Sequence, residues 1–362
     1  MRTLFKSALV ALLFASAAHC QSPSLRLFSE TRPAMGTKFT IHLFAADERK
    51  AAEYFELAFD EIDRIEEVLS NYRPSSELSR INSRAAQEAV TTDPEVFALL
   101  RLALDFSRRS NGAFDITVGP LVRAWGFFRG EGRYPSAEEL AKARAVVGWK
   151  NVQLDPASRT VHYRFPGVEL DLGAVGKGYA LDRVIELLRE AGVQSALVDA
   201  GSSTMLALGA PPGEEGWRVQ IPQPANRTQS VSSVLLRDAS LSTSGSYEKF
   251  FRLNGRTYCH IFDPRIGEPV QNMLQTTVIA SDATTSDILS TALFVLGPAA
   301  GKELLRSGPD AKVLWIQGEP QALQLVFWRW PDPVFPSASS PRQSPRRPLA
   351  DRQFVQRRFF QR

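Results

Sequence analysis

Apolar and polar positions alternate in some stretches of the chain and recur at helical spacing in others, so the pattern mixes strands with helices. Residues 38–44 alternate, which predicts a half-buried strand. Residues 49–70 carry apolar side chains every three or four positions with charges between them, which predicts a long helix packed on the core. Another helix should begin where Asp93 caps a first-turn proline, and it should end before Asn111.

Shorter elements are predicted from capping and turn residues. A polar turn over residues 70–78 should lead into a short helix capped by Ser75 or Ser76, and Ser136 with Glu139 forms a capping box for a further helix. Strands and helices that come in runs, without a strict alternation, favour an α+β fold with mixed or antiparallel sheets and packed helices. The pattern contains no internal repeat and predicts no transmembrane span. The remaining expected elements are a hairpin at 152–154 and 160–165, strands at 196–199, 205–208, 217–221, 231–236, 258–262, 276–280, 312–316 and 323–328, and one strong helix at 285–296.

The stretch from Val168 to Gly178 predicts a site for an anion. Residues 168–172 have the pattern of a short buried strand, and a glycine-rich turn from Gly173 leads directly into a helix that runs to about Leu188. Glycines allow backbone N–H groups to approach an anion, and a helix N-terminus offers unpaired donors and a partial positive charge, so a phosphate fits there. The spacing differs from the Walker phosphate loop, because a glycine follows Lys177 where that loop has Ser or Thr. An ordinary strand-to-helix turn with a solvated lysine is the alternative.

The two ends of the chain differ from its body. Residues 1–20 have Arg2 and Lys6 ahead of an apolar run, which is typical of a signal peptide and predicts an exported protein of the periplasm or cell envelope. Acylation of Cys20 as a lipoprotein cysteine is one alternative for this end, and plain cleavage near Ala17 or Cys20 is the other. Residues 331–362 are rich in proline and arginine and should form a disordered tail, either solvated or in contact with anionic lipid.

The charge distribution argues against a nucleic-acid-binding body. The whole chain has a formal charge of +4, but the tail contributes +5 and the first 20 residues +2, which leaves −3 on residues 21–330. The chain has two cysteines, Cys20 and Cys259, so removal or acylation of the first leaves no internal disulfide.

Histidine chemistry is limited to three candidates once His19 is removed with the signal. His42 and His162 lie at strand positions and are most simply structural. His260 lies at a predicted strand end before a Pro-Arg-Ile-Gly turn, where an imidazole can face a cleft and act as a general base; a structural histidine is the alternative.

Asp287 and Thr291 are four residues apart on the predicted helix at 285–296, so they share a face and can place a carboxylate and a hydroxyl on one hard cation such as Mg²⁺. The alternative for Asp287 is a charge that simply favours the helix dipole. Residues 242–246 are rich in serine but lack the Gly-x-Ser-x-Gly pattern, which argues against a serine hydrolase.

Several blocks of the chain, in this order, closely resemble the ApbE family of FAD:protein FMN transferases. Each block alone is a weak signal, whereas all of them in register are a strong one. The resemblance covers about Met35 to Leu296 and rests on Met35–Thr37, Tyr72–Leu78, Gly112–Pro120, Asp171–Tyr179, His260–Pro264 and Asp287–Thr291.

This resemblance implies an ApbE-like domain over residues 21–330 and a Mg²⁺-dependent transfer of FMN from FAD to a Thr or Ser hydroxyl of a target protein, with release of AMP. It implies that His260 is the general base and also lines the FAD site. Ser290 stands where the family's metal helix often has a second acidic residue. The implied FAD-lining residues are Met35, Tyr72, Ala113, Phe114, Asp115, Asp171 and Lys177, and the implied Mg²⁺ ligands are Asp287, Thr291 and the main-chain oxygen of Ala174.

The partners implied are exported or membrane-associated redox proteins that carry an Asp-x-x-Ser/Thr-Gly-Ala-Ser/Thr segment. Breaking a pyrophosphate requires charge stabilisation at the phosphoryl oxygens and a base for the attacking hydroxyl, and the residues above supply a candidate for each role. If water attacks instead, the same site is an FAD pyrophosphatase, and if nothing attacks, the protein is an exported flavin carrier.

Overall fold

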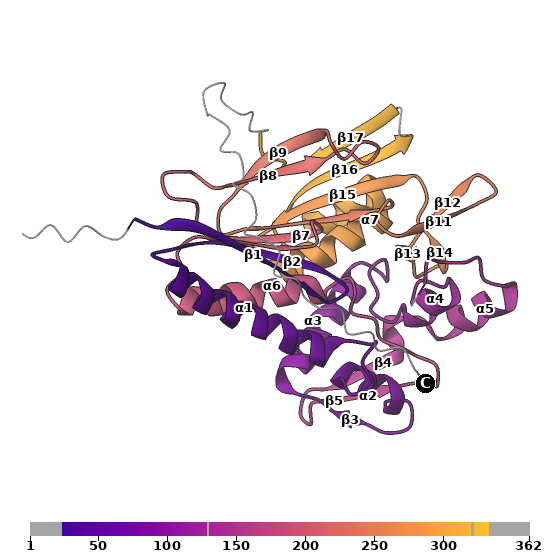
Figure 1. Ribbon diagram of the computed structural model, residues 1–362. Coiled ribbons are helices and arrows are strands. Elements are labelled where there is room, and N and C mark those ends of the chain that lie inside the picture. Colours follow the sequence, from indigo (N-terminus) through magenta and orange to yellow (C-terminus); the bar gives the residue numbers. More distant parts are fainter. Residues whose placement is uncertain (1–23, 129, 320–321, 333–362) are drawn as a thin grey trace, which may run out of the picture.

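A central antiparallel sheet organises the protein (Figure 1). The computed structural model describes residues 24–128, 130–319 and 322–332, so the predicted signal peptide with Cys20 and nearly all of the predicted tail lie outside the described residues. The sheet has eight strands in the order β1-β2-β6-β7-β10-β15-β16-β17, and every neighbouring pair is antiparallel. The strands are β1 (Arg26–Ala34), β2 (Thr37–Ala45), β6 (Ala196–Ala200), β7 (Thr204–Leu208), β10 (Ser240–Gly245), β15 (Met273–Ala280), β16 (Lys312–Glu319) and β17 (Ala322–Trp328).

The two faces of this sheet are covered differently. On one face lie α1 (Glu48–Leu69), α6 (Gly176–Glu190) and α7 (Ala283–Arg306), whose apolar stripes form the main core with the strands. On the other face the β8–β9 hairpin (Trp217–Pro222 and Ser230–Leu236) covers a smaller apolar cluster. Burial on both faces explains why β10 and β15 are buried almost throughout and why β16 is buried over residues 313–316.

A second group of elements lies beside the helical face. It contains α2 (Glu77–Arg84), α3 (Pro94–Arg109), α4 (Gly119–Ala124), α5 (Ala137–Val146), the 3₁₀ turn η1 (Trp149–Asn151), the small sheet β3-β5-β4 (Val90–Thr91, Thr160–Tyr163, Val152–Asp155), and the hairpins β11–β12 (Phe250–Leu253, Arg256–Cys259) and β13–β14 (Phe262–Asp263, Glu268–Pro269). An aromatic cluster around Trp125 joins α4, α5 and these hairpins. The fold is therefore α+β, as predicted.

Helix starts follow the predicted capping residues. Ser76 caps α2 by accepting a hydrogen bond from the N–H of Ser79, and Asp93 caps α3 with a proline at its first turn. Ser136 and Glu139 form both hydrogen bonds of the capping box of α5. Such local hydrogen bonds depend on nearby residues alone, which is why the sequence predicts them well.

The predicted strand at 168–172 is wrong, because this segment is irregular. Its N–H groups find other partners: the N–H of Leu170 donates to Asn82 Oδ1 and that of Asp171 donates to the carbonyl of Ile116. Val168, Leu170 and Leu172 are buried on alternate positions, which produces the pattern of a strand without a neighbouring strand. The predicted strand at 258–262 is also interrupted, since β12 ends at Cys259 and the chain bends at His260 before β13.

The helix predicted at 285–296 is longer than expected. It begins at Ala283 and continues to Arg306 across a kink at Gly297, where φ is +66° and Pro298 follows. In the part of the chain that the structure describes, α7 is the one helix with a length and composition that would suit a membrane span. Ile288, Leu289 and Leu293 are nevertheless 0% exposed, because α7 packs between the sheet and α6, as an interior helix does.

Candidate functional site

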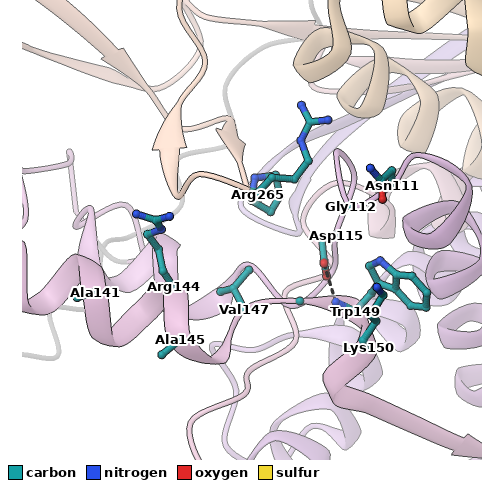
Figure 2. Close-up of a pocket in the computed structure, with 12 residues that line it drawn as sticks. Asn111, Gly112, Asp115, Ala141, Arg144, Ala145, Val147, Trp149, Lys150 and Arg265 are labelled. Atoms are coloured by element: carbon teal, nitrogen blue, oxygen red, sulfur yellow. Dashed lines mark hydrogen bonds between the residues drawn. The ribbon is translucent and has the colours of Figure 1, made fainter.

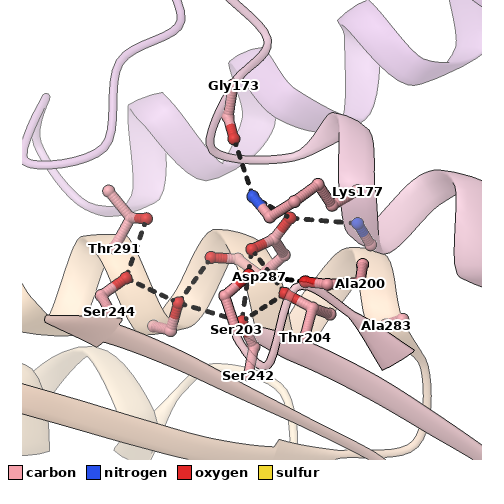
Figure 3. Close-up of polar contacts among 12 residues, drawn as sticks. Gly173, Lys177, Ala200, Ser203, Thr204, Ser242, Ser244, Ala283, Asp287 and Thr291 are labelled. Atoms are coloured by element: carbon pink, nitrogen blue, oxygen red, sulfur yellow. Dashed lines mark hydrogen bonds and ion pairs between the residues drawn. The ribbon is translucent and has the colours of Figure 1, made fainter. Parts of the chain in front are cut away.

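Asp287 is a buried carboxylate at the meeting point of α6, α7 and the sheet (Figure 3). Its side chain belongs to α7 and the residue is only 4% exposed. Oδ1 accepts hydrogen bonds from the hydroxyls of Thr204 on β7 (3.1 Å) and Ser242 on β10 (3.2 Å). Oδ2 accepts from the N–H of Gly178 in the first turn of α6 (3.0 Å). The carboxylate is therefore anchored by neutral donors from three elements.

Lys177 brings a positive charge to this carboxylate. Its Nζ donates to the carbonyl of Gly173 (3.1 Å) and lies 3.8 Å from Asp287 Oδ2. Gly178 permits the close approach of the two helices, since a Cβ atom there would lie 2.2 Å from the carbonyl oxygen of Ala283. The glycines of the turn therefore serve helix packing as well as access to the helix N-terminus.

A row of hydroxyls continues from Asp287 toward Thr291. Ser244 Oγ lies 2.9 Å from Ser290 Oγ and 3.3 Å from Thr291 Oγ1, and the Ser290 hydroxyl donates to the main-chain oxygen of Asp287 (3.0 Å). Residues 242–245 belong to β10, a strand that the sequence did not predict, and Ser242 and Ser244 face α7. The period-two serines at 240, 242 and 244 are the signal that could have revealed a polar strand face.

The α7 N-terminus is held by Asp182, a residue that sequence reasoning also missed. Its carboxylate accepts from the N–H groups of Ala283 (2.7 Å) and Thr284 (2.8 Å). Burial raises the pKa of Asp182 to about 6, although these donors oppose the shift. Asp182 belongs to α6, so α6 positions α7 and with it Asp287.

The implied Mg²⁺ ligands give an oxygen donor set that fits this cation. Asp287 and Thr291 lie on one face of α7, and Ala174 directly follows Gly173, whose carbonyl receives Lys177. Among the described residues no group of three or more His, Cys, Asp or Glu side chains could hold a metal ion. One carboxylate supplemented by neutral oxygens and by substrate phosphates is a common arrangement for Mg²⁺. The residues present therefore suit Mg²⁺ better than zinc.

Three implied FAD-lining residues gather at the glycine turn. Asp171 Oδ1 accepts from the N–H of Gly173 (2.8 Å), and burial raises the pKa of this carboxyl. The methyl carbon of Met35 would lie 3.4 Å from a Cβ atom at Gly176. Lys177 is the third, so these side chains surround the start of α6.

The implied FAD residues Ala113, Phe114 and Asp115 are buried, each 5% exposed or less, and the carboxylate of Asp115 is fully engaged. Oδ1 accepts from the N–H and hydroxyl of Thr117, while Oδ2 accepts from the N–H of Trp149 at 2.7 Å (Figure 2). Burial raises the pKa of Asp115. Its side chain thus ties the loop after α3 to η1, and its implied FAD contact stays a prediction.

A cavity of about 550 Å³ lies next to this loop. It is lined on one side by Gly112 and Asp115 and on another by α5, and Arg144, Lys150 and Arg265 bring positive charge to its walls (Figure 2).

His260 lies at the bend between β12 and β13. Its backbone N–H and Nδ1 both lie within hydrogen-bonding distance of the carbonyl of Lys249, at 3.0 and 3.1 Å. Burial, and secondarily the ammonium groups of Lys249 and Lys177, lowers the pKa of His260 to about 4. With Nδ1 donating to the carbonyl, the neutral ring keeps Nε2 as an acceptor, which is the state a general base requires.

The other candidates from the sequence lie elsewhere. His42 is on β2, where Nδ1 lies 2.6 Å from Ser29 Oγ, and His162 is on β5. Cys259 is a free, buried thiol among the described residues, and burial raises its pKa to about 11. His42 and His162 thus lie on strands, as the sequence predicted.

A helix N-terminus with a lysine and a buried carboxylate among hydroxyls is an arrangement that can bind a phosphate, and the neutral imidazole of His260 can accept a proton. Comparison with known proteins identifies the family. The model of the ApbE family matches residues 35–315, and the chain therefore belongs to the ApbE family.

Similar curated proteins share one name, FAD:protein FMN transferase. The chain is 34% identical over 294 residues to an FAD:protein FMN transferase of Klebsiella pneumoniae strain 342, covering 80% of this chain and 89% of that protein. It is 31% identical over 314 residues to the FAD:protein FMN transferase of Escherichia coli K12, covering 84% and 86%. The resemblance seen in the sequence motifs is confirmed.

Solved structures confirm the fold. The ApbE protein of Thermotoga maritima superposes with a TM-score of 0.76 at 30% identity, covering 84% of this chain and 97% of that chain. The flavinyl transferase ApbE of Pseudomonas stutzeri, in its apo form, superposes with a TM-score of 0.74 at 32% identity, covering 84% and 95%.

Proposed function

We propose that this chain is an exported FAD:protein FMN transferase that moves FMN from FAD onto a Thr or Ser hydroxyl of a target protein and releases AMP. The observation that carries the proposal is the convergence of Asp287, Lys177 and the N-terminus of α6, with Nζ 3.8 Å from the carboxylate and Gly178 N–H 3.0 Å from it. Family membership supports the same reaction, because the similar proteins carry that name.

The reaction needs one bond made and one broken. The acceptor hydroxyl oxygen attacks the FMN phosphorus of FAD, the pyrophosphate bond breaks, and AMP leaves with the bond electrons. Nε2 of His260 takes the hydroxyl proton, while the Lys177 ammonium and the positive end of the α6 dipole stabilise the negative charge on the phosphoryl oxygens.

Mg²⁺ is the cofactor that this donor set would hold, through Asp287, Thr291 and the main-chain oxygen of Ala174. When bound, it would neutralise charge on the phosphoryl oxygens. The chain's own contribution is to orient the Asp287 carboxylate, which the hydroxyls of Thr204 and Ser242 fix in place.

The proposed acceptors are exported or membrane-associated redox proteins that carry the Asp-x-x-Ser/Thr-Gly-Ala-Ser/Thr segment. Location in the periplasm or cell envelope, membrane association and acylation of Cys20 belong to the same proposal. The apolar run behind Arg2 and Lys6 supports export, and the prolines and arginines of residues 331–362 support contact with anionic lipid.

A direct test combines the purified protein with FAD, Mg²⁺ and a peptide that carries the acceptor segment. We expect AMP in solution and a peptide whose mass has increased by that of FMN. Asp287→Asn should need more Mg²⁺ and turn over about 10² to 10³ times more slowly, because a charged ligand is lost. Free FMN as the sole flavin product would make the protein an FAD pyrophosphatase, and tight FAD binding without AMP would make it a flavin carrier.

A further inference from the structure

Tyr72 belongs to a column of stacked planar groups. Its ring lies 4.6 Å from the ring of Phe128, with 19° between the planes. The guanidinium carbon of Arg123 lies 3.6 Å from the centroid of the Phe128 ring. An aromatic pair backed by a cation is stabilised by both stacking and cation–π attraction.

The column is anchored to the protein at its cationic end. Arg123 belongs to α4 and donates two hydrogen bonds to the carboxylate of Glu169, at 2.6 and 2.7 Å. The Glu169 side chain is only 16% exposed, whereas that of Arg123 is 48% exposed. This bidentate pair fixes the plane of the guanidinium, and the guanidinium in turn limits how Phe128 can lie.

The column also adjoins the phosphate-binding turn. Asn71, the neighbour of Tyr72, donates from Nδ2 to Asp171 Oδ2 (3.1 Å), and Asp171 accepts from the N–H of Gly173. Tyr72 itself remains 45% exposed, which is a large area for an aromatic side chain so close to a buried site. An aromatic surface tied to a phosphate site suits a ligand that has both a planar ring and a phosphate.

We propose that Phe128 is a positioning residue for FAD: it holds the Tyr72 ring so that the pair forms a stacking surface for one of the two planar ring systems of FAD, the flavin or the adenine. The inference rests on the proposed function for the identity of the ligand. It adds Phe128, with Arg123 and Glu169 behind it, to the residues that determine binding.

The test measures binding of FMN and AMP separately, without an acceptor, for the wild-type protein, Phe128→Leu and Phe128→Tyr. The matched control is Phe327→Leu, since Phe327 is similarly exposed at 48% but lies on β17 beside Trp330. Urea denaturation of each variant shows whether the fold is intact. Because the assay needs no turnover, its outcome is independent of whether transfer, hydrolysis or neither follows binding.

Phe128→Leu should weaken binding of one of the two nucleotides roughly fivefold or more and leave the other unchanged, because only one ring contacts the column. Phe128→Tyr should restore affinity, and Phe327→Leu should have no effect. Loss for FMN identifies the flavin ring and loss for AMP identifies the adenine, and either supports the proposal. Unchanged affinity for both, or an equal loss for both that Phe128→Tyr does not restore, overturns it.

Discussion

His260 shows how burial selects a protonation state at a single residue. Its pKa is lowered to about 4, chiefly because the protein removes water from the ring and disfavours the charged form. An unperturbed histidine titrates near pH 6.5, so a His260 with its ordinary pKa would be partly protonated at neutral pH and partly inactive as a base. The structure therefore keeps the imidazole neutral over the whole range in which most enzymes work.

The first prediction concerns the pH dependence of transfer. The acidic limb of kcat/KM should fall near pH 4, not near 6.5, because the neutral form of His260 persists to the lower value. His260→Gln should slow transfer by roughly 10² to 10⁴ while FAD binding stays near normal, and it should flatten this limb. Steady-state rates over roughly pH 3 to 8 measure the limb, and FAD titrations at neutral pH measure binding.

The control is His42→Gln on β2, which should leave the acidic limb of kcat/KM unchanged.

The pH dependence of protein stability gives an independent check on the pKa of His260. Between about pH 4 and 6.5 the unfolded chain binds a proton at His260 that the folded chain does not, so the contribution of His260 to the free energy of unfolding should fall as the pH falls through this window, whereas Asp182, with its raised pKa, contributes in the opposite direction. His260→Gln should reduce that slope in urea denaturation, and an unaltered slope would contradict the assigned pKa.

At the scale of elements, the site depends on how closely α6 approaches α7. Asp182 on α6 accepts the first N–H groups of α7, and Gly178 on α6 donates to Asp287 on α7. These two contacts hold α6 and α7 against each other. Lys177 on α6 and Asp287 on α7 therefore lie close together because of helix packing, and no loop is needed to position them. The relative position of Lys177 and Asp287 therefore depends on the packing of α6 against α7.

The second prediction uses two glycines in the same helical turn. Gly178→Ala should destabilise the protein by about 1 to 3 kcal/mol or more, because its Cβ would lie 2.2 Å from a backbone carbonyl that cannot move freely. Gly176→Ala should leave the free energy of unfolding nearly unchanged, because its Cβ would meet only the flexible end of the Met35 side chain at 3.4 Å. Urea midpoints compare the two variants. Equal stability of both would show that the close approach of α6 and α7 is not needed.

At the scale of the whole molecule, the eight-stranded sheet, which is covered on both faces, provides hydrogen-bond donors to Asp287. β7 and β10 supply Thr204 and Ser242 to Asp287 from the middle of this sheet, and both residues are fully buried. The division of the chain into residues 1–20, 21–330 and 331–362 stays a prediction from composition. β17, which ends at Trp328, closes one edge of the sheet.

The third prediction is that deletion of residues 335–362 leaves FAD binding and turnover on a soluble acceptor nearly unchanged. A segment rich in proline and arginine buries too little apolar surface to support the core. Deletion from residue 322 onward is the contrasting variant, because it also removes β17 and exposes the edge of β16. Soluble yield, thermal unfolding and FAD titration compare the two, and loss of folded protein in the shorter deletion would refute the prediction.

Local interactions explain what the sequence could predict. Capping residues such as Ser76, Asp93 and Ser136 form hydrogen bonds with residues two or three positions away. The apolar positions of an amphipathic helix such as α1 are the ones that are buried. The α+β class and the family could be predicted for the same reason, since both follow from ordered local blocks. Asp287 and Thr291 could be proposed as cation ligands from their spacing, whereas Ala174 and the FAD-lining residues were named from the family resemblance. All of these ligand contacts remain predictions.

Tertiary structure decided the rest. The segment at 168–172 has the pattern of a strand, yet it pairs with Asn82 and Ile116, which lie far away in the sequence. Ser242, Ser244 and Asp182 gain their roles only because the sheet and α6 bring them to α7. Hydrophobic periodicity reports whether a side chain is buried, but the partner of a buried polar group is set by packing between distant elements, and no local pattern contains that information.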